Sequence, residues 1–134
     1  MEINNEILNI PTSEEKFFDE YLMLKKPILE YMLSKLNDKP IILNPKLMNV
    51  FALLLYYNNI HRDKEDIDKW KIIFDNGTKK DIADKLHINA KHLNTYLSIL
   101  RNIKLLNGKS INKPFIIYPE SEFSLIYKFT INNA

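Results

Sequence analysis

Residues 78–106 read TKKDIADKLHINAKHLNTYLSILRNIKLL, and this stretch contains two short helical patterns separated by a break. In the first pattern, Thr78 is a predicted N-cap and Asp81 lies in the first turn, where the helix dipole favours a negative charge. Residues 87–89 interrupt the pattern, and Asn89 is a suitable N-cap for a second helix. The stretch therefore predicts two helices joined by a tight turn.

The apolar residues of this stretch recur every three or four positions, which places them on one face of each helix. We expect them to pack between the two helices and against a core, where the small side chain of Ala83 permits a close approach. These residues are Ile82, Ala83, Leu86, Ile88, Leu93, Tyr96, Leu97 and Leu100. We expect the opposite face of the second helix to be exposed to solvent.

That outward face, within residues 89–102, is basic, amide or hydroxyl, and it contains no carboxylate. Asn suits bidentate pairing with adenine, Arg suits guanine, and Lys attracts phosphate as a point charge. The free N–H groups of a helix N-terminus also favour a phosphate backbone. The candidate DNA-binding residues on this helix are Asn89, Lys91, His92, Asn94, Thr95, Ser98, Arg101 and Asn102.

These residues resemble the winged helix-turn-helix family of phage and low-GC bacterial proteins, over about residues 78–131. Five of the apolar positions match the packing positions of that motif: Ile82, Ala83, Leu86, Ile88 and Leu93. The resemblance implies that residues 89–102 form a recognition helix for the major groove and that Lys79 and Lys80 hold phosphates. Two positions depart from the pattern, because His87 and Lys104 stand where the family often has Gly with positive φ.

Beyond this unit the pattern becomes extended. Residues 114–119 (PFIIYP) and 123–131 (FSLIYKFTI) are rich in β-branched and aromatic residues, and the polar corner Glu120-Ser121-Glu122 separates them. We expect a terminal β-hairpin, which would be the wing. In winged-helix proteins, lysines placed like Lys109 and Lys113 touch the DNA backbone or the minor groove; alternatively, these two lysines simply solubilise a hydrophobic hairpin.

The N-terminal half predicts helices of its own. Thr12 and Glu15 form a capping box, and Pro27 either kinks the helix that follows or opens a new one. Asn44-Pro45 is a cap with proline at the first helical position. The next helix, to about Asn59, is apolar on nearly every side, so we expect it at the centre of the core.

Two local signals predict one more helix, with Asp63 as its N-cap and Asn76-Gly77 as its end, since Gly favours the left-handed C-terminal position. The first helix also has an aromatic stripe, which is either core or an oligomer surface. Its members are Phe17, Phe18, Tyr21 and Tyr31.

The predicted fold is mainly α with a small C-terminal β-hairpin, forming a single domain over residues 1–134. An N-terminal helical layer would occupy residues 1–60, and a winged helix-turn-helix would occupy residues 61–134. The length suits one compact domain, and the 46% hydrophobic residues supply its core.

Charge is unevenly distributed along the chain. Residues 1–75 hold 10 Lys and Arg against 13 Asp and Glu, whereas residues 76–134 hold 9 against 4. The first part is therefore −3 and the second +5, which suggests a polyanionic partner for the second, although plain solvated surfaces also show such an excess.

Several kinds of chemistry have no residues to support them. The chain has no cysteine, its three histidines are not at ligand spacing, and two glycines cannot build a phosphate-binding loop. The paired carboxylates lie at helix starts or on predicted exposed faces. We therefore expect no metal, no cofactor and no enzymatic activity.

The longest apolar run, residues 50–57, is far shorter than the roughly 20 residues that span a bilayer, and the N-terminus lacks a secretory signal, so we expect a cytoplasmic protein. The leading hypothesis is a transcriptional or replication regulator that binds double-stranded DNA. The alternative is a structural or adaptor subunit that binds protein in a large assembly, such as the head-tail region of a phage virion. Homo-oligomerisation through the N-terminal helices is compatible with either hypothesis. The Asn, Lys and Ile usage is typical of an AT-rich genome.

Overall fold

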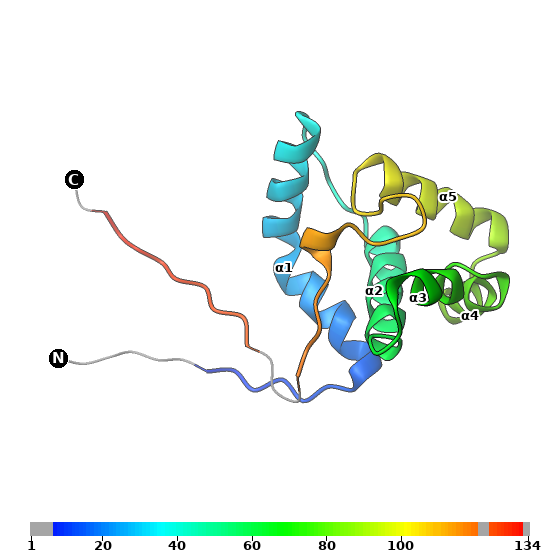
Figure 1. Cartoon of the computed structure of the whole chain (residues 1–134). Helices are drawn as coiled ribbons and strands as arrows, with labels where there is room; N and C mark the ends of the chain where they lie inside the picture. Colours follow the sequence, from blue (N-terminus) through cyan, green and yellow to red (C-terminus); the bar gives the residue numbers. More distant parts are fainter. Residues whose placement is uncertain (1–6, 121–123, 133–134) are drawn as a thin grey trace.

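The computed structural model describes residues 7–120 and 124–132, and the body of this described part is built from five α-helices (Figure 1). They are α1 (Glu14–Asn37), α2 (Pro45–Ile60), α3 (Asp66–Ile73), α4 (Asn76–Leu86) and α5 (Ala90–Asn102). A short 3-10 helix, η1, covers Lys113–Phe115.

The helix α2 lies at the centre of this body and contacts α1, α3, α4 and α5. It begins as predicted, because the Asn44 side-chain oxygen accepts a hydrogen bond from the backbone N–H of Leu47 (2.8 Å) and Pro45 occupies the first turn. Its buried apolar residues surround the helix axis: Leu47, Val50, Phe51, Ala52, Leu53, Leu54 and Leu55. The prediction of a central apolar helix is confirmed.

The helix α1 is one continuous helix with Pro27 inside it. Its N-cap is Ser13 rather than the predicted Thr12, since the Ser13 hydroxyl accepts the backbone N–H of Lys16 (3.2 Å). The predicted aromatic stripe divides in two. Phe18 and Tyr21 are buried, whereas Tyr31 is exposed, so the stripe is only partly core.

The boundary between α3 and α4 differs from the prediction. The helix α3 begins at Asp66, so Asp63 does not cap it, and Asn76-Gly77 opens α4 instead of ending α3. The N-cap of α4 is Asp75, whose carboxylate accepts the N–H of Thr78 (2.7 Å). Only two residues separate α3 from α4. The Asn76-Gly77 pair, which was predicted to end α3, therefore lies in the first turn of α4.

The predicted C-terminal β-hairpin is wrong, and with it the winged form of the fold. The described residues contain no β-strand, only an isolated antiparallel bridge between Leu106 and Ile111. Pro114, which has no N–H to give to a ladder, lies instead in η1, next to the buried Phe115. Residues 124–132 run as an extended chain away from the helical body (Figure 1). The predicted corner at residues 121–122 lies outside the described residues.

Candidate nucleic-acid interface

The turn between α4 and α5 forms as the sequence predicts. His87 adopts the left-handed conformation (φ 55°), which ends α4 where Gly is more usual. Two hydrogen bonds close the turn, from the N–H of His87 to the Asp84 carbonyl (3.2 Å) and from the N–H of Ile88 to the Ala83 carbonyl (3.0 Å). This pair of bonds is the Schellman arrangement, which fixes the direction in which the chain leaves a helix.

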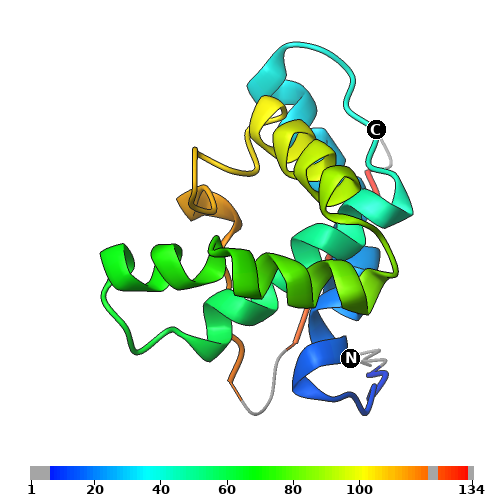
Figure 2. The same cartoon turned by 90° about the vertical axis from the view of Figure 1, so that its right-hand side faces the viewer.

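The apolar face of α5 packs into the core as predicted. Leu93, Leu97 and Leu100 are buried at intervals of three and four residues, and Ile82 and Ala83 of α4 are buried beside them. The N-cap is Asn89, whose side-chain oxygen accepts the N–H of His92 (2.7 Å). Burial of one face and a capped first turn together fix which side of α5 points outward. Figure 2 shows α4 and α5 on one side of the body, in front of α2.

Most of the predicted DNA-binding side chains of α5 are exposed, but three of them already take part in local hydrogen bonds. Asn89 caps the helix, the Thr95 hydroxyl donates to the Lys91 carbonyl (3.1 Å), and the Arg101 Nε donates to the Gly108 carbonyl (2.8 Å). The remaining predicted residues are exposed at the outer side of the helix: Lys91, His92, Asn94, Ser98 and Asn102. These five form the α5 outer stripe.

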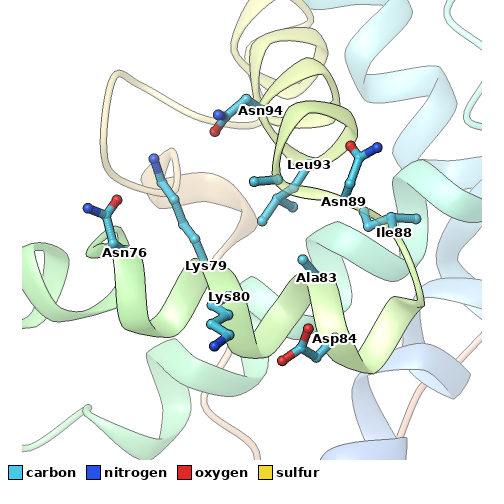
Figure 3. Close-up of a pocket in the computed structure, with 10 residues that line it drawn as sticks. Asn76, Lys79, Lys80, Ala83, Asp84, Ile88, Asn89, Leu93 and Asn94 are labelled. Atoms are coloured by element: carbon cyan, nitrogen blue, oxygen red, sulfur yellow. The ribbon is translucent and has the colours of Figure 1, made fainter.

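A groove of about 390 Å³ lies between α4 and the first turns of α5 (Figure 3). Figure 3 shows Lys79 directed toward the side of the groove where Asn94 lies, whereas Lys80 and Asp84 point to the other side. The structure therefore brings Lys79 together with the α5 outer stripe and separates Lys80 from it.

Two residues of this groove were not among the predicted site residues. Asn76 opens α4 on the same wall as Lys79, and Asp84 places a carboxylate on the wall opposite α5. The absence of acids within α5 predicted a surface without negative charge, but Asp84 of α4 lines the groove, on the side away from Asn94 (Figure 3). Asp84 is close to α5 only because α4 packs against α5, which the sequence pattern of α5 alone does not show.

The two lysines predicted for the wing occupy other surroundings. Lys109 is exposed in a turn whose ends, Asn107 and Ser110, exchange backbone hydrogen bonds (2.8 and 3.2 Å). It borders a shallow depression with Trp70 and Asp75, beside the N-terminus of α4. Lys113 is exposed at the start of η1. Neither lysine lies on a β-strand, so neither occupies a wing.

A contact between α4 and α1 lies outside the α5 outer stripe. The hydrogen bond from Lys85 to Glu15 is the main cause of the raised pKa of Lys85, and it ties α4 to the N-terminal turn of α1. Lys85 is thereby partnered by a carboxylate, in contrast to the exposed Lys91 on the neighbouring helix.

The described residues contain neither a group of metal ligands nor a helix that could cross a membrane. Among residues 7–120 and 124–132, no three His, Asp or Glu side chains are grouped so that they could hold a metal ion. In the same part of the chain, every helix is too short or too polar to cross a bilayer.

Comparison with protein-family models, with curated proteins and with solved structures found no match to this chain.

Proposed function

We propose that this chain is a non-enzymatic DNA-binding protein of the helix-turn-helix class, in which residues 89–102 enter a major groove of double-stranded DNA. It would act as a small transcriptional or replication regulator in the cytoplasm of a bacterium or of an infected bacterial cell. The observation that supports this most is the α5 outer stripe, a row of exposed donor side chains on a helix without any carboxylate.

The exposed residues of α5 suit different parts of the duplex. The Asn94 side-chain amide can pair with adenine through two hydrogen bonds, and Ser98 can bond to any base edge. Lys91 and His92 lie in the first turn of α5, where they suit phosphates beside the groove. Lys79 adds a second lysine from α4 on the same side as Asn94.

Other predicted residues serve this interface indirectly. Asn89 uses its side-chain oxygen in the helix cap, and Arg101 uses its Nε in a hydrogen bond to the Gly108 carbonyl. Both therefore position the helix, and only their remaining N–H donors are left for DNA. Lys80 lies on the groove wall with Asp84, whose negative charge weakens the attraction for phosphate there. We therefore expect Lys79 to contribute more to DNA affinity than Lys80.

Affinity for labelled duplexes, measured by fluorescence anisotropy between about 50 and 200 mM salt, tests this function. The logarithm of the association constant should fall linearly with the logarithm of the salt concentration. Lys91→Ala should reduce that slope by about one, and Asn94→Ala should cost roughly 1–3 kcal/mol and relax the preference at one base position.

The matched control is Lys16→Ala, which removes an exposed lysine at the start of α1. This variant should bind duplexes like the unmodified chain. If no duplex of any sequence binds at the lowest salt concentration, the proposed function is wrong.

A second candidate function is that of a structural or adaptor subunit, for example in the head-tail region of a phage virion, where α4 and α5 would bind protein. The observation that favours it is the number of large apolar side chains exposed on α1 and on residues 124–132. In that case the salt titration would show no duplex binding, and a virion would be the location of the chain.

A further inference from the structure

The segment 124–132 has the residue pattern of a β-strand but no strand beside it. Alternate positions are apolar (Leu125, Tyr127, Phe129 and Ile131), whereas all but one of the intervening positions are polar. This period of two is that of a strand with one face to bury. Within the described part of the chain the segment is extended and joins no sheet.

Only the first two residues of the apolar face of this segment contact the rest of the chain. Leu125 is half-buried against the core, and the Tyr127 hydroxyl donates to the Leu24 carbonyl of α1 (2.7 Å). The next two members of the same face are almost fully accessible, with Phe129 90% and Ile131 84% exposed. Exposed apolar side chains in a row usually mark an interaction surface.

The helix α1 presents a matching apolar strip next to this segment. Met23, Leu24, Ile28 and Tyr31 are exposed on α1, and Leu24 is the residue that Tyr127 contacts. The strip and the apolar face of the segment together hold seven large apolar side chains with substantial exposure: Met23, Leu24, Ile28, Tyr31, Tyr127, Phe129 and Ile131. At roughly 100 Å² each, they would supply about 700 Å² per copy, which is close to the size of a standard protein interface.

We propose that residues 124–132 pair with the same residues of a second copy, as an antiparallel two-stranded ribbon that packs on the α1 strips of both copies. A symmetric pair centred on Tyr127 aligns Leu125 with Phe129 of the second copy and keeps Leu125, Tyr127, Phe129 and Ile131 on one face, with Ile126 on the other. Phe129 then lies over the α1 strip of the other copy. The ribbon alone would be marginal, and the two α1 strips supply the surface that it needs.

The single charge of the segment excludes one neighbouring register, and the cross-linking described below distinguishes the others. A pair centred on Lys128 would place two lysines directly opposite each other, which is destabilising. A pair centred on Ile126 would match only residues 124–128 with one another and leave Phe129 and Ile131 beyond them. Centring on Tyr127 matches residues 124–130 and sets Lys128 opposite Ile126. The dimer is independent of the proposed DNA binding, although it would present two copies of α5 about a two-fold axis.

Sedimentation of the full chain over a range of concentrations tests the dimer. Phe129→Lys with Ile131→Lys should raise the dimer dissociation constant by roughly a hundred-fold or more, because both side chains leave water in the dimer. The matched control, Thr130→Lys with Asn132→Lys, adds the same charge to the opposite face without placing two lysines opposite each other, and it should change that constant by no more than about three-fold. Helical circular dichroism should be unchanged in both, since all four positions lie outside the helices.

Disulfide cross-linking of single introduced cysteines then identifies the register of the ribbon, because the chain has no cysteine of its own. Tyr127→Cys should cross-link with its copy most efficiently, whereas two copies of Phe129→Cys would lie four residues apart along the ribbon, about 13 Å, and should cross-link poorly. A chain that stays monomeric up to millimolar concentration would overturn the proposal, even if another protein's sheet then bound the segment. A dimer that ignores the Phe129 and Ile131 changes, or cross-links equally at both positions, would overturn it as well.

Discussion

The helices α2 and α5 are both rich in leucine, yet they stand in opposite relations to solvent. The helix α2 is buried around its whole circumference and contacts every other α-helix of the described body. The helix α5 buries only Leu93, Leu97 and Leu100, and its other side faces outward. A helix buried on all sides can only support the fold, whereas a two-faced helix can be held by one side and bind with the other. Changes in α2 should therefore affect stability alone, and outward changes in α5 should affect binding.

The largest expected effect is a core truncation in α2. Phe51 is 2% exposed at the centre of the core, so Phe51→Ala should lower the free energy of unfolding by about 3–5 kcal/mol. Urea denaturation followed by circular dichroism measures this loss. Asn94→Ala on the outward face of α5 is the comparison, and it should change stability by less than about 0.5 kcal/mol. Equal effects of the two substitutions would abolish the distinction between the helices.

A smaller effect of opposite sign is expected at Asn58, one of the two buried polar residues of α2. Asn58 is 0% exposed, and neither its side-chain oxygen nor its side-chain nitrogen has a hydrogen-bond partner among the described residues. Burying an unpaired amide costs free energy, so Asn58→Leu, of similar size, should stabilise the chain by about 1–2 kcal/mol. A higher urea midpoint with an unchanged slope would show this. Loss of stability in Asn58→Leu would mean that the amide is needed by the fold.

The two helices begin with the same kind of cap, which permits a matched test. Asn44 caps α2 and Asn89 caps α5, each through its side-chain oxygen. Either residue changed to Ala should cost about 1 kcal/mol of stability. Only Asn89→Ala should also weaken duplex binding, because it loosens the first turn that carries Lys91 and His92. Comparing thermal melts with anisotropy for both variants measures the two effects, and equal weakening of duplex binding by Asn44→Ala would contradict the account.

The smallest effect is a pH dependence at the end of α2. Burial of the His61 ring, followed by the nearby charge of Lys64, lowers the pKa of His61 from its usual 6.5. Below pH 6.5 the unfolded chain therefore takes up a proton that the folded chain refuses. Stability is complete above that pH and falls as the pH drops through the lower folded pKa. His61→Gln should reduce the loss of stability between pH 7 and pH 5, measured by urea denaturation at each pH.

Local patterns were enough to predict α5 and its turn. The spacing of Leu93, Leu97 and Leu100, together with the Asn89 cap, depends on residues within about four positions of one another. His87 and Lys104 both adopt positive φ without being glycine, at 55° and 71°, so the departure from the family pattern did not remove these turns. The burial of one face follows from the same short-range spacing.

The incorrect predictions depended on relations that short patterns do not contain. Pairing of residues 114–119 with 123–131 requires that neither segment has a better position, but Phe115 is buried in the core and Pro114 occupies a 3-10 turn. Asn76-Gly77 resembles a helix end, yet the Asp75 cap makes it a beginning. Asp84 was not predicted as a site residue for a similar reason, because it lines the groove from α4, the helix beside α5.

The central claim is that α5 meets a partner through its outward face, and that this partner is DNA. Amide chemical shifts of the isotope-labelled chain, followed while a duplex is added at low salt, test this claim most directly. The account predicts shift changes in the first turn of α4 and in residues 89–98, with little change in α1 or in residues 124–132. Absence of any change, or changes confined to α1 and the C-terminal segment, would contradict it.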